Sequence, residues 1–148
     1  PKRMASAQSR TVRFLEGLDD RVFLAGIVCV PFVLRLWLAA TIPLTEDEAY
    51  YRLWALSPAA SYLDHPPMVG WLMAAGMMLA GDTAIGLRLG GIFAAAISVL
   101  ALWRIAVLLT DIATSRIAVL FASVIPLLSV GVIIMTPDTP SVLFYTLG

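Results

Sequence analysis

The chain has 148 residues, of which 60% are hydrophobic and 14% are charged, and its formal net charge is zero. Its mean hydropathy of +0.90 and its low charge exclude an ordinary soluble domain, in which about 25% of residues are charged. The balance of charge also offers no basic surface for nucleic acid. The composition predicts an integral membrane protein.

The N-terminal segment 1–21 is rich in basic residues, and we expect it to stay in the cytoplasm. The apolar run 22–42 that follows is about 21 residues long, which at 1.5 Å per residue matches the hydrocarbon core of roughly 30 Å. It exceeds the apolar region of a signal peptide, which is about 7 to 15 residues. The run therefore predicts a transmembrane helix, which Pro31 can kink and in which Arg35 can snorkel or pair with an acid. Cys29 lies in this run and reads as a small buried side chain that forms no intrachain disulfide.

Four further apolar runs follow. The run 66–80, about 15 residues, is short for a span and predicts a helix that lies in the membrane interface, with Trp71 at headgroup level. The runs 84–109 and 117–135 predict two more spans, and another begins at 141. Because the chain opens on Pro1 and stops inside an apolar run, we expect residues 22–148 to be the N-terminal part of a longer transmembrane domain.

The interpretation of the run 66–80 decides the topology. If it lies on the outer surface, the loop 43–83 and the segment "TPDTP" around Asp138 share the outer face, and Arg104 and Arg116 flank an inner loop. If it spans, "TPDTP" and the loop 43–83 lie on opposite sides. The first arrangement obeys the positive-inside rule better. The predicted fold is therefore an all-α, polytopic transmembrane helix bundle with short interfacial helices in the outer loop 43–83.

The segment "TEDEAYYRLW" has the form of a helix start. Thr45 is a plausible N-cap, the three acids that follow would lie in the positively polarised first turn, and Glu48 could pair with Arg52 at i,i+4. This structural reading accounts for all three acids, and for Glu46 and Glu48 a structural and a functional role are equally open. Asp47 is harder to explain in this way, because it faces Tyr51 beside the membrane exit, where a lipid-facing acid would be costly.

Two more segments combine structural and functional signals. In "YLDHPPMVGW" the prolines can start a helix with Asp64 as its electrostatic partner. His65, the only histidine, could bind a phosphate, ligate a metal or carry a proton, although a lone histidine is more often structural. Asp138 in "TPDTP" could simply cap the next helix. It gains weight because it would share one face with Asp47 and Asp64.

The ordered set "DEAYY", "YLDHPPMVGW" and "TPDTPSVLFY" resembles the polytopic glycosyltransferases of the C superfamily, in the branch of protein O-mannosyltransferases and lipid A aminoarabinose transferases. The resemblance covers nearly the whole chain from residue 45 onward. It implies an inverting enzyme that moves a sugar from a polyprenyl-phosphate donor to a lipid, glycan or protein acceptor on the extracytoplasmic face. A bacterial inner membrane with a periplasmic active site is the expected location, and the fragment is expected to be inactive alone.

The resemblance also implies roles for individual residues. Asp47, Glu48 and Asp138 match the catalytic acids, and Asp64 matches a position that can contribute to a metal or head-group site. A divalent metal thus stays an open question. The position of His65 is a lysine in aminoarabinose transferases, so the sugar cannot be copied from them.

The chemistry needs both a base and cations. A carboxylate such as Asp47 can take the proton of an acceptor hydroxyl, and the leaving lipid phosphate needs positive charge or hydrogen-bond donors. His65, Arg52 and Tyr51 are the candidate groups for the donor phosphate, beside a metal or basic residues after position 148.

Two other function classes agree less well with the sequence. An ion-coupled secondary transporter or channel segment would place acids inside the spans, where this sequence has none. A purely structural membrane anchor would make the loop motifs coincidental.

Overall fold

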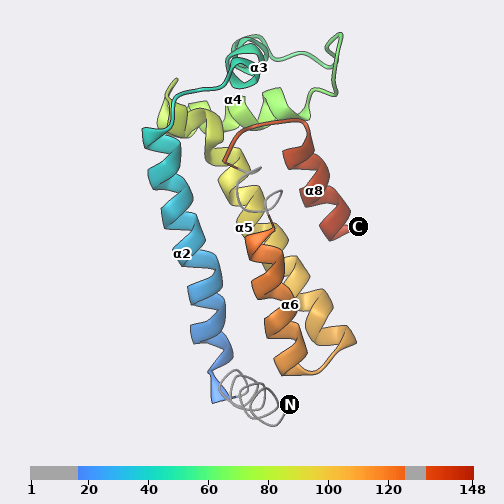
Figure 1. The fold of residues 1–148 in the computed structure, drawn as a ribbon. Helices are drawn as coiled ribbons and strands as arrows, with labels where there is room; N and C mark the ends of the chain where they lie inside the picture. The colour runs from blue at the N-terminus through green and yellow to red at the C-terminus, as the bar shows by residue number, and fades with distance from the viewer. Residues whose placement is uncertain (1–16, 126–132) are drawn as a thin grey trace, which may run out of the picture.

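The computed structural model describes residues 17–125 and 133–148, and these residues form helices and connecting segments without a strand. The helices, in chain order, are α2 (Asp20–Thr41), α3 (Glu46–Leu56), α4 (Met68–Ala80), α5 (Ala84–Leu109), α6 (Ile112–Val124) and α8 (Asp138–Leu147) (Figure 1). The predicted all-α fold is confirmed, and the architecture is that of a helical membrane bundle.

Helix α5 forms the centre of the bundle and packs against α2, α4, α6 and α8. Two helices, α2 with 22 residues and α5 with 26 residues, are long and apolar enough to cross a membrane. At 1.5 Å per residue they measure about 33 Å and about 39 Å. Their bounds agree closely with the runs 22–42 and 84–109.

The boundaries of the last two helices differ from those expected. Helix α6 begins at residue 112 rather than 117, because the Asp111 carboxylate accepts hydrogen bonds from the Thr114 amide at 3.1 Å and from the Thr114 hydroxyl. It ends at Val124, and residues 133–137 precede α8 without helix; residues 126–132 of the expected run 117–135 lie outside the described ranges. Helix α8 starts at Asp138, three residues before the expected apolar run.

Helices α3 and α4 lie across one end of the bundle rather than along it (Figure 1). This is the arrangement predicted for interfacial helices. Helix α4 has 13 residues and is about 20 Å long, too short for the hydrocarbon core. It packs very closely on α5, since a Cβ atom added to Gly76 would lie 2.1 Å from the Gly86 carbonyl oxygen. Helix α3 in turn packs on α4.

The segment between α2 and α3 and the segment that leads into α8 lie at the same end of the bundle, beside α3 and α4 (Figure 1). A buried cluster that includes Tyr51, Trp54, Met73 and Met135 joins α3, α4 and the segment before α8 at this end. The polar residues of both loops therefore meet, as the shared-face topology requires.

The structure contradicts the prediction for Cys29 and excludes one of the two alternatives for Arg35, which was snorkelling or pairing with an acid. Cys29 is exposed rather than buried, because α2 packs against the bundle on one side and presents its other face outward. Arg35 is only 5% exposed and therefore lies on the packed side of α2, not on a surface from which it could snorkel along lipid.

Candidate active site

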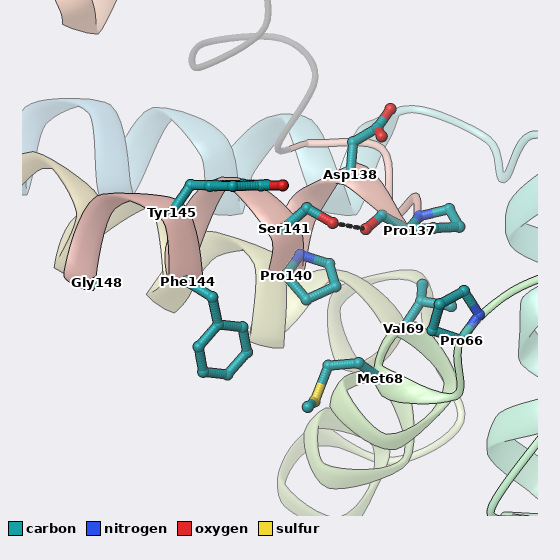
Figure 2. A pocket seen from close by; sticks show the side chains of 10 residues that line it. All are labelled: Pro66, Met68, Val69, Pro137, Asp138, Pro140, Ser141, Phe144, Tyr145 and Gly148. Atoms are coloured by element: carbon teal, nitrogen blue, oxygen red, sulfur yellow. Dashed lines mark hydrogen bonds between the residues drawn. The ribbon is translucent and has the colours of Figure 1, made fainter.

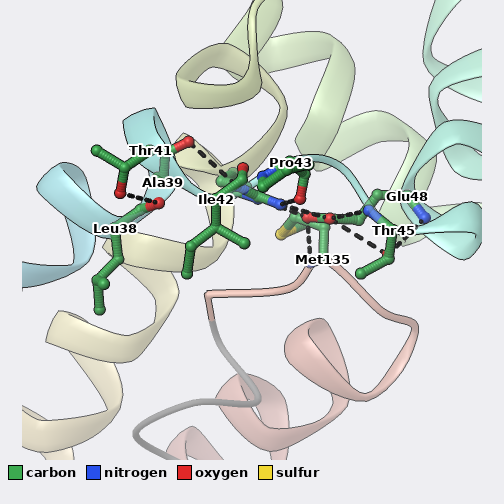
Figure 3. Close-up of polar contacts among 9 residues, drawn as sticks. Leu38, Ala39, Thr41, Ile42, Pro43, Thr45, Glu48 and Met135 are labelled. Atoms are coloured by element: carbon green, nitrogen blue, oxygen red, sulfur yellow. Dashed lines mark hydrogen bonds and ion pairs between the residues drawn. The ribbon is translucent and has the colours of Figure 1, made fainter.

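A buried ion pair forms the foundation of this end of the bundle. The side chains of Glu48 and Arg88 are both fully buried, and their contacts are drawn in Figure 3. Arg88 Nε donates to Glu48 Oε1 at 2.7 Å, and Arg88 Nη2 donates to Glu48 Oε2 at 2.7 Å. The pair is thus bidentate, the geometry in which an arginine binds a carboxylate most strongly.

The remaining donors of Arg88 complete the end of α2. Nη1 donates to the carbonyl oxygens of Ala39 at 3.0 Å and Ile42 at 2.8 Å, and Nη2 donates to the carbonyl oxygen of Pro43 at 2.9 Å. The last carbonyls of a helix have no partner within the helix, so Arg88 supplies donors that the chain would otherwise lack here. It fixes the exit of α2 to the start of α5.

Glu48 joins the same centre to two other segments. Its Oε2 atom accepts from the Thr45 amide at 3.0 Å, and the Thr45 hydroxyl accepts from the Glu48 amide at 3.2 Å, which makes a capping box. Its Oε1 atom accepts from the Met135 amide at 3.1 Å. Thr45 is therefore the N-cap that the sequence predicted, and the segment that carries Asp138 is tied to the start of α3.

The charge of Glu48 is stable in this position. Burial raises the pKa of Glu48, but the hydrogen bonds from Arg88, Thr45 and Met135 outweigh it and hold the pKa below its ordinary value. Both oxygens are occupied by protein donors, and the predicted i,i+4 pair with Arg52 is wrong. The geometry makes Glu48 a residue that positions its neighbours.

Asp47, Asp64 and Asp138 converge near Tyr51. All three carboxylates are exposed and Tyr51 is buried. Burial raises the pKa of the Tyr51 phenol, and the charges of Asp47, Asp64 and Asp138 raise it further. Three loops or helix starts thus bring acids around one hydroxyl group that stays protonated and can donate a hydrogen bond.

The loop 57–66 carries Asp64 and His65 to this place. The Tyr62 ring stacks on Trp54, with centroids 4.2 Å apart, and the Tyr62 hydroxyl lies 3.0 Å from the carbonyl oxygens of Trp54 and Ser57. His65 is exposed, and its ring lies edge-on to Tyr51 with centroids 6.1 Å apart. His65 therefore lies beside the acids, with its ring open to solvent.

The structure gives Asp64 a partner on α3 and contradicts the prediction that Asp138 caps the next helix. The Asp64 carboxylate accepts from the Tyr50 hydroxyl at 2.7 Å, and its role as the electrostatic partner of α4 stays a prediction. Helix α8 has Pro137 as its N-cap, without a side-chain capping bond. Asp138 is the first residue of the helix, and its carboxylate is not used as the cap.

Arg52 lies apart from this arrangement. Its guanidinium pairs with Asp82, through Nε at 2.7 Å and through Nη2. The contact joins α3 to the turn between α4 and α5. Among the described residues no group of three or more histidine, cysteine, aspartate or glutamate side chains has the spacing of a metal site, so the assignment of Asp64 to a metal stays a prediction.

An apolar pocket of about 490 Å³ has Asp138 in its lining. Figure 2 shows it between the start of α4, with Pro66, Met68 and Val69, and one face of α8, with Pro140 and Phe144. Asp138 lies at the end of this face. The volume falls in the range of about 300 to 1,000 Å³ that is usual for ligand sites.

The sequence missed Arg88 as part of the site. The available signal was a charge near the start of an apolar helix, which in a membrane protein needs a partner, but its acid lies 40 positions away in the chain. The sequence also did not pair Tyr50 with Asp64, because this contact depends on how the loop folds back over α3.

The comparison with family models gives an independent result. The model described as dolichyl-phosphate-mannose-protein mannosyltransferase matches residues 64–148, more than half of the chain. The match begins at Asp64 and includes His65, Arg88 and Asp138. Searches of curated proteins and of solved structures found no match. The family resemblance is thereby confirmed for the part of the chain that carries most of "YLDHPPMVGW" and all of "TPDTPSVLFY", whereas "DEAYY" precedes the matched residues. The chain belongs to the dolichyl-phosphate-mannose-protein mannosyltransferase family, a family of membrane glycosyltransferases.

Proposed function

We propose that this chain forms the acid-bearing part of an enzyme that transfers a sugar from a polyprenyl-phosphate donor to an acceptor hydroxyl with inversion. The observation that carries the proposal is that three segments with exposed acids meet at one end of the bundle, beside an apolar pocket that Asp138 lines. Hydrogen bonds tie the segments together, from Tyr50 to Asp64 and from the Met135 amide to Glu48. The family description names dolichyl phosphate and mannose, which favours a mannosyl donor of this kind and a protein acceptor.

Asp47 is the proposed base. The acceptor oxygen attacks the anomeric carbon, the bond from that carbon to the phosphate oxygen breaks, and the acceptor proton passes to the Asp47 carboxylate. A single displacement of this kind inverts the configuration. Asp47 suits the role because its carboxylate is exposed while that of its neighbour Glu48 is held by Arg88.

The leaving lipid phosphate needs donors rather than a strong acid. The protonated Tyr51 hydroxyl and the His65 imidazole are the nearby groups that can supply hydrogen bonds, while Arg52 is held by Asp82. The apolar pocket between α4 and α8 would receive the part of the prenyl chain next to the phosphate. Its lining follows α8 from Asp138 to Phe144 (Figure 2), and α8 leads away from the end that carries α3 (Figure 1).

The test is the substitution Asp47→Asn in the full-length enzyme, assayed with a lipid-linked mannose donor. Loss of a general base typically costs about 10²- to 10⁴-fold in rate, and we expect a loss of this size with normal membrane insertion. Glu46→Gln is the matched control, because Glu46 is an exposed acid in the same helical turn. Near-normal transfer by Asp47→Asn would exclude Asp47 as the base.

The extracytoplasmic face is part of the proposal and can be tested separately. Asp138→Cys in a Cys29→Ser background should react with a membrane-impermeant maleimide added to the outside of intact cells. Labelling only after the membrane is opened would place this end of the bundle in the cytoplasm and contradict a periplasmic site.

A further inference from the structure

Tyr50 makes the contact that fixes the acidic end of the loop 57–66 on α3. Its hydroxyl donates to Asp64 Oδ2 at 2.7 Å, and among the described residues this is the hydrogen bond that the Asp64 carboxylate receives. The hydrogen bond from Tyr50 to the carboxylate raises the pKa of the Tyr50 phenol. The donor is a neutral group, so the contact adds no opposite charge beside Asp64.

The rest of this loop is anchored elsewhere. The Tyr62 hydroxyl accepts from the Ala59 amide at 2.9 Å, and Trp71 Nε1 donates to the Ala59 carbonyl oxygen at 3.0 Å. These contacts hold the first half of the loop against α3 and α4. They do not involve the Asp64 carboxylate, which accepts its hydrogen bond from Tyr50.

The ring of Tyr50 is itself well placed to act as an anchor. It lies edge-on to Trp54, with centroids 5.2 Å apart, and 5.7 Å from the ring of Tyr51. Tyr51 and Trp54 are also the rings that His65 approaches, at 6.1 Å and 6.4 Å. One aromatic group thus supports Tyr50 and His65 together.

We propose that Tyr50 is a positioning residue that holds Asp64, and through it His65, in the orientation that receives the sugar-phosphate part of the donor. This inference rests on the proposed function. Tyr50 takes no part in bond making or breaking. It fixes one oxygen of Asp64 and leaves the other free, and it limits the motion of the adjacent imidazole beside the buried Tyr51 hydroxyl.

The experiment is a kinetic comparison of Tyr50→Phe with the wild-type full-length enzyme. The phenylalanine keeps the ring contacts with Tyr51 and Trp54 and removes only the hydroxyl. We expect KM for the lipid-linked donor to rise about tenfold, the change that 1.4 kcal/mol produces, while kcat changes by less than about twofold. Thr41→Val is the control, since it removes another exposed hydroxyl, bonded to the Trp37 carbonyl oxygen at 3.0 Å, and should leave KM unchanged.

A double-mutant cycle separates positioning from general damage. In the Asp64→Ala background, Tyr50→Phe should have no further effect on KM, because the group that it positions is gone. If Tyr50→Phe lowers kcat with an unchanged KM, or if its effect on KM persists in Asp64→Ala, the positioning role is wrong.

Two further outcomes are informative. If Tyr50→Phe does not fold, hydrogen exchange of the loop 57–66 in the Asp64→Ala variant takes the place of the kinetic comparison. We expect the amides of the loop to exchange faster than in wild type, and unchanged exchange would overturn the proposal. If the wild-type enzyme does not use a lipid-linked donor at all, the proposed function fails instead, whereas wild-type transfer with an unaltered Tyr50→Phe variant refutes only the role of Tyr50.

Discussion

The ion pair between Glu48 and Arg88 gives the sharpest prediction on stability. Arg88→Met removes the bidentate contact and the three donors to the carbonyls of Ala39, Ile42 and Pro43. It leaves the Glu48 carboxylate fully buried with only neutral donors. Removing one partner of a buried pair costs about 3 to 5 kcal/mol, so we expect a loss in this range.

The size of the loss distinguishes an uncompensated charge from lost packing. In Glu48→Met combined with Arg88→Met no buried charge is left, and replacing a buried ion pair by apolar side chains is often neutral or stabilising. The double variant should therefore be more stable than Arg88→Met alone. It should remain inactive, because Met135 and the segment that carries Asp138 have lost their attachment to α3.

The assay is unfolding of the purified enzyme in mixed micelles, titrated with sodium dodecyl sulfate, together with mannosyl transfer. Arg104→Met is the matched control: Arg104 lies on the same helix, is exposed, and should cost less than about 0.5 kcal/mol, as surface substitutions usually do. Equal unfolding free energies for Arg88→Met and Arg104→Met, or transfer restored in the double variant, would refute the reasoning.

Three further predictions follow from the same end of the bundle. The native pKa of Glu48 lies below its ordinary value of 4.5, so the contribution of the Glu48 carboxylate to the stability of the fold is present above pH 4.5. This contribution is lost as the pH falls through the native pKa. The free energy of unfolding, measured against pH, should show the loss in wild type and not in Glu48→Gln. Gly76→Ala should cost about 1 to 3 kcal/mol, since the new Cβ would meet the Gly86 carbonyl, whereas Gly26→Ala, with open space around it, should not destabilise in the same titration. Asp82→Asn should change the unfolding free energy little, because its pair with Arg52 is partly exposed and such pairs contribute little. A clear loss in the titration would contradict this and show that the contact holds the turn between α4 and α5.

The local features of this end could be predicted because they depend on neighbours in the chain. Thr45 could be predicted as an N-cap because three acids follow it directly. The prolines before α4 predict a helix start because the first turn needs no amide hydrogen from them. The short run 66–80 could be recognised as too short to span. If this run does not span, the count of the remaining spans places the segment of Asp138 on the same side as α3. The structure has the two segments in contact, through the hydrogen bond from the Met135 amide to Glu48.

The long-range features could not be predicted, since no local rule specifies them. Arg88 lies 40 residues from Glu48, and the carbonyls that it binds belong to the end of α2. Similarly, Tyr50 reaches Asp64 because Tyr62 stacks on Trp54 and turns the loop back. Such contacts follow from packing of several elements, so a charge pattern read along the chain assigns Glu48 to Arg52 instead.

In the proposed mechanism the two adjacent acids Asp47 and Glu48 have different roles, Asp47 in the reaction and Glu48 in stability. Successive residues of an α-helix point about 100° apart, because there are 3.6 residues per turn. When Glu48 turns into the bundle to meet Arg88, Asp47 must therefore face outward, toward Asp64 and Asp138. The buried carboxylate is saturated with donors and cannot accept a proton readily, whereas the exposed one is free to do so. A substitution at Glu48 should consequently impair transfer by moving Asp47 and Asp138, and its kinetic effect should track the loss of stability, while Asp47→Asn should abolish transfer in an enzyme of normal stability.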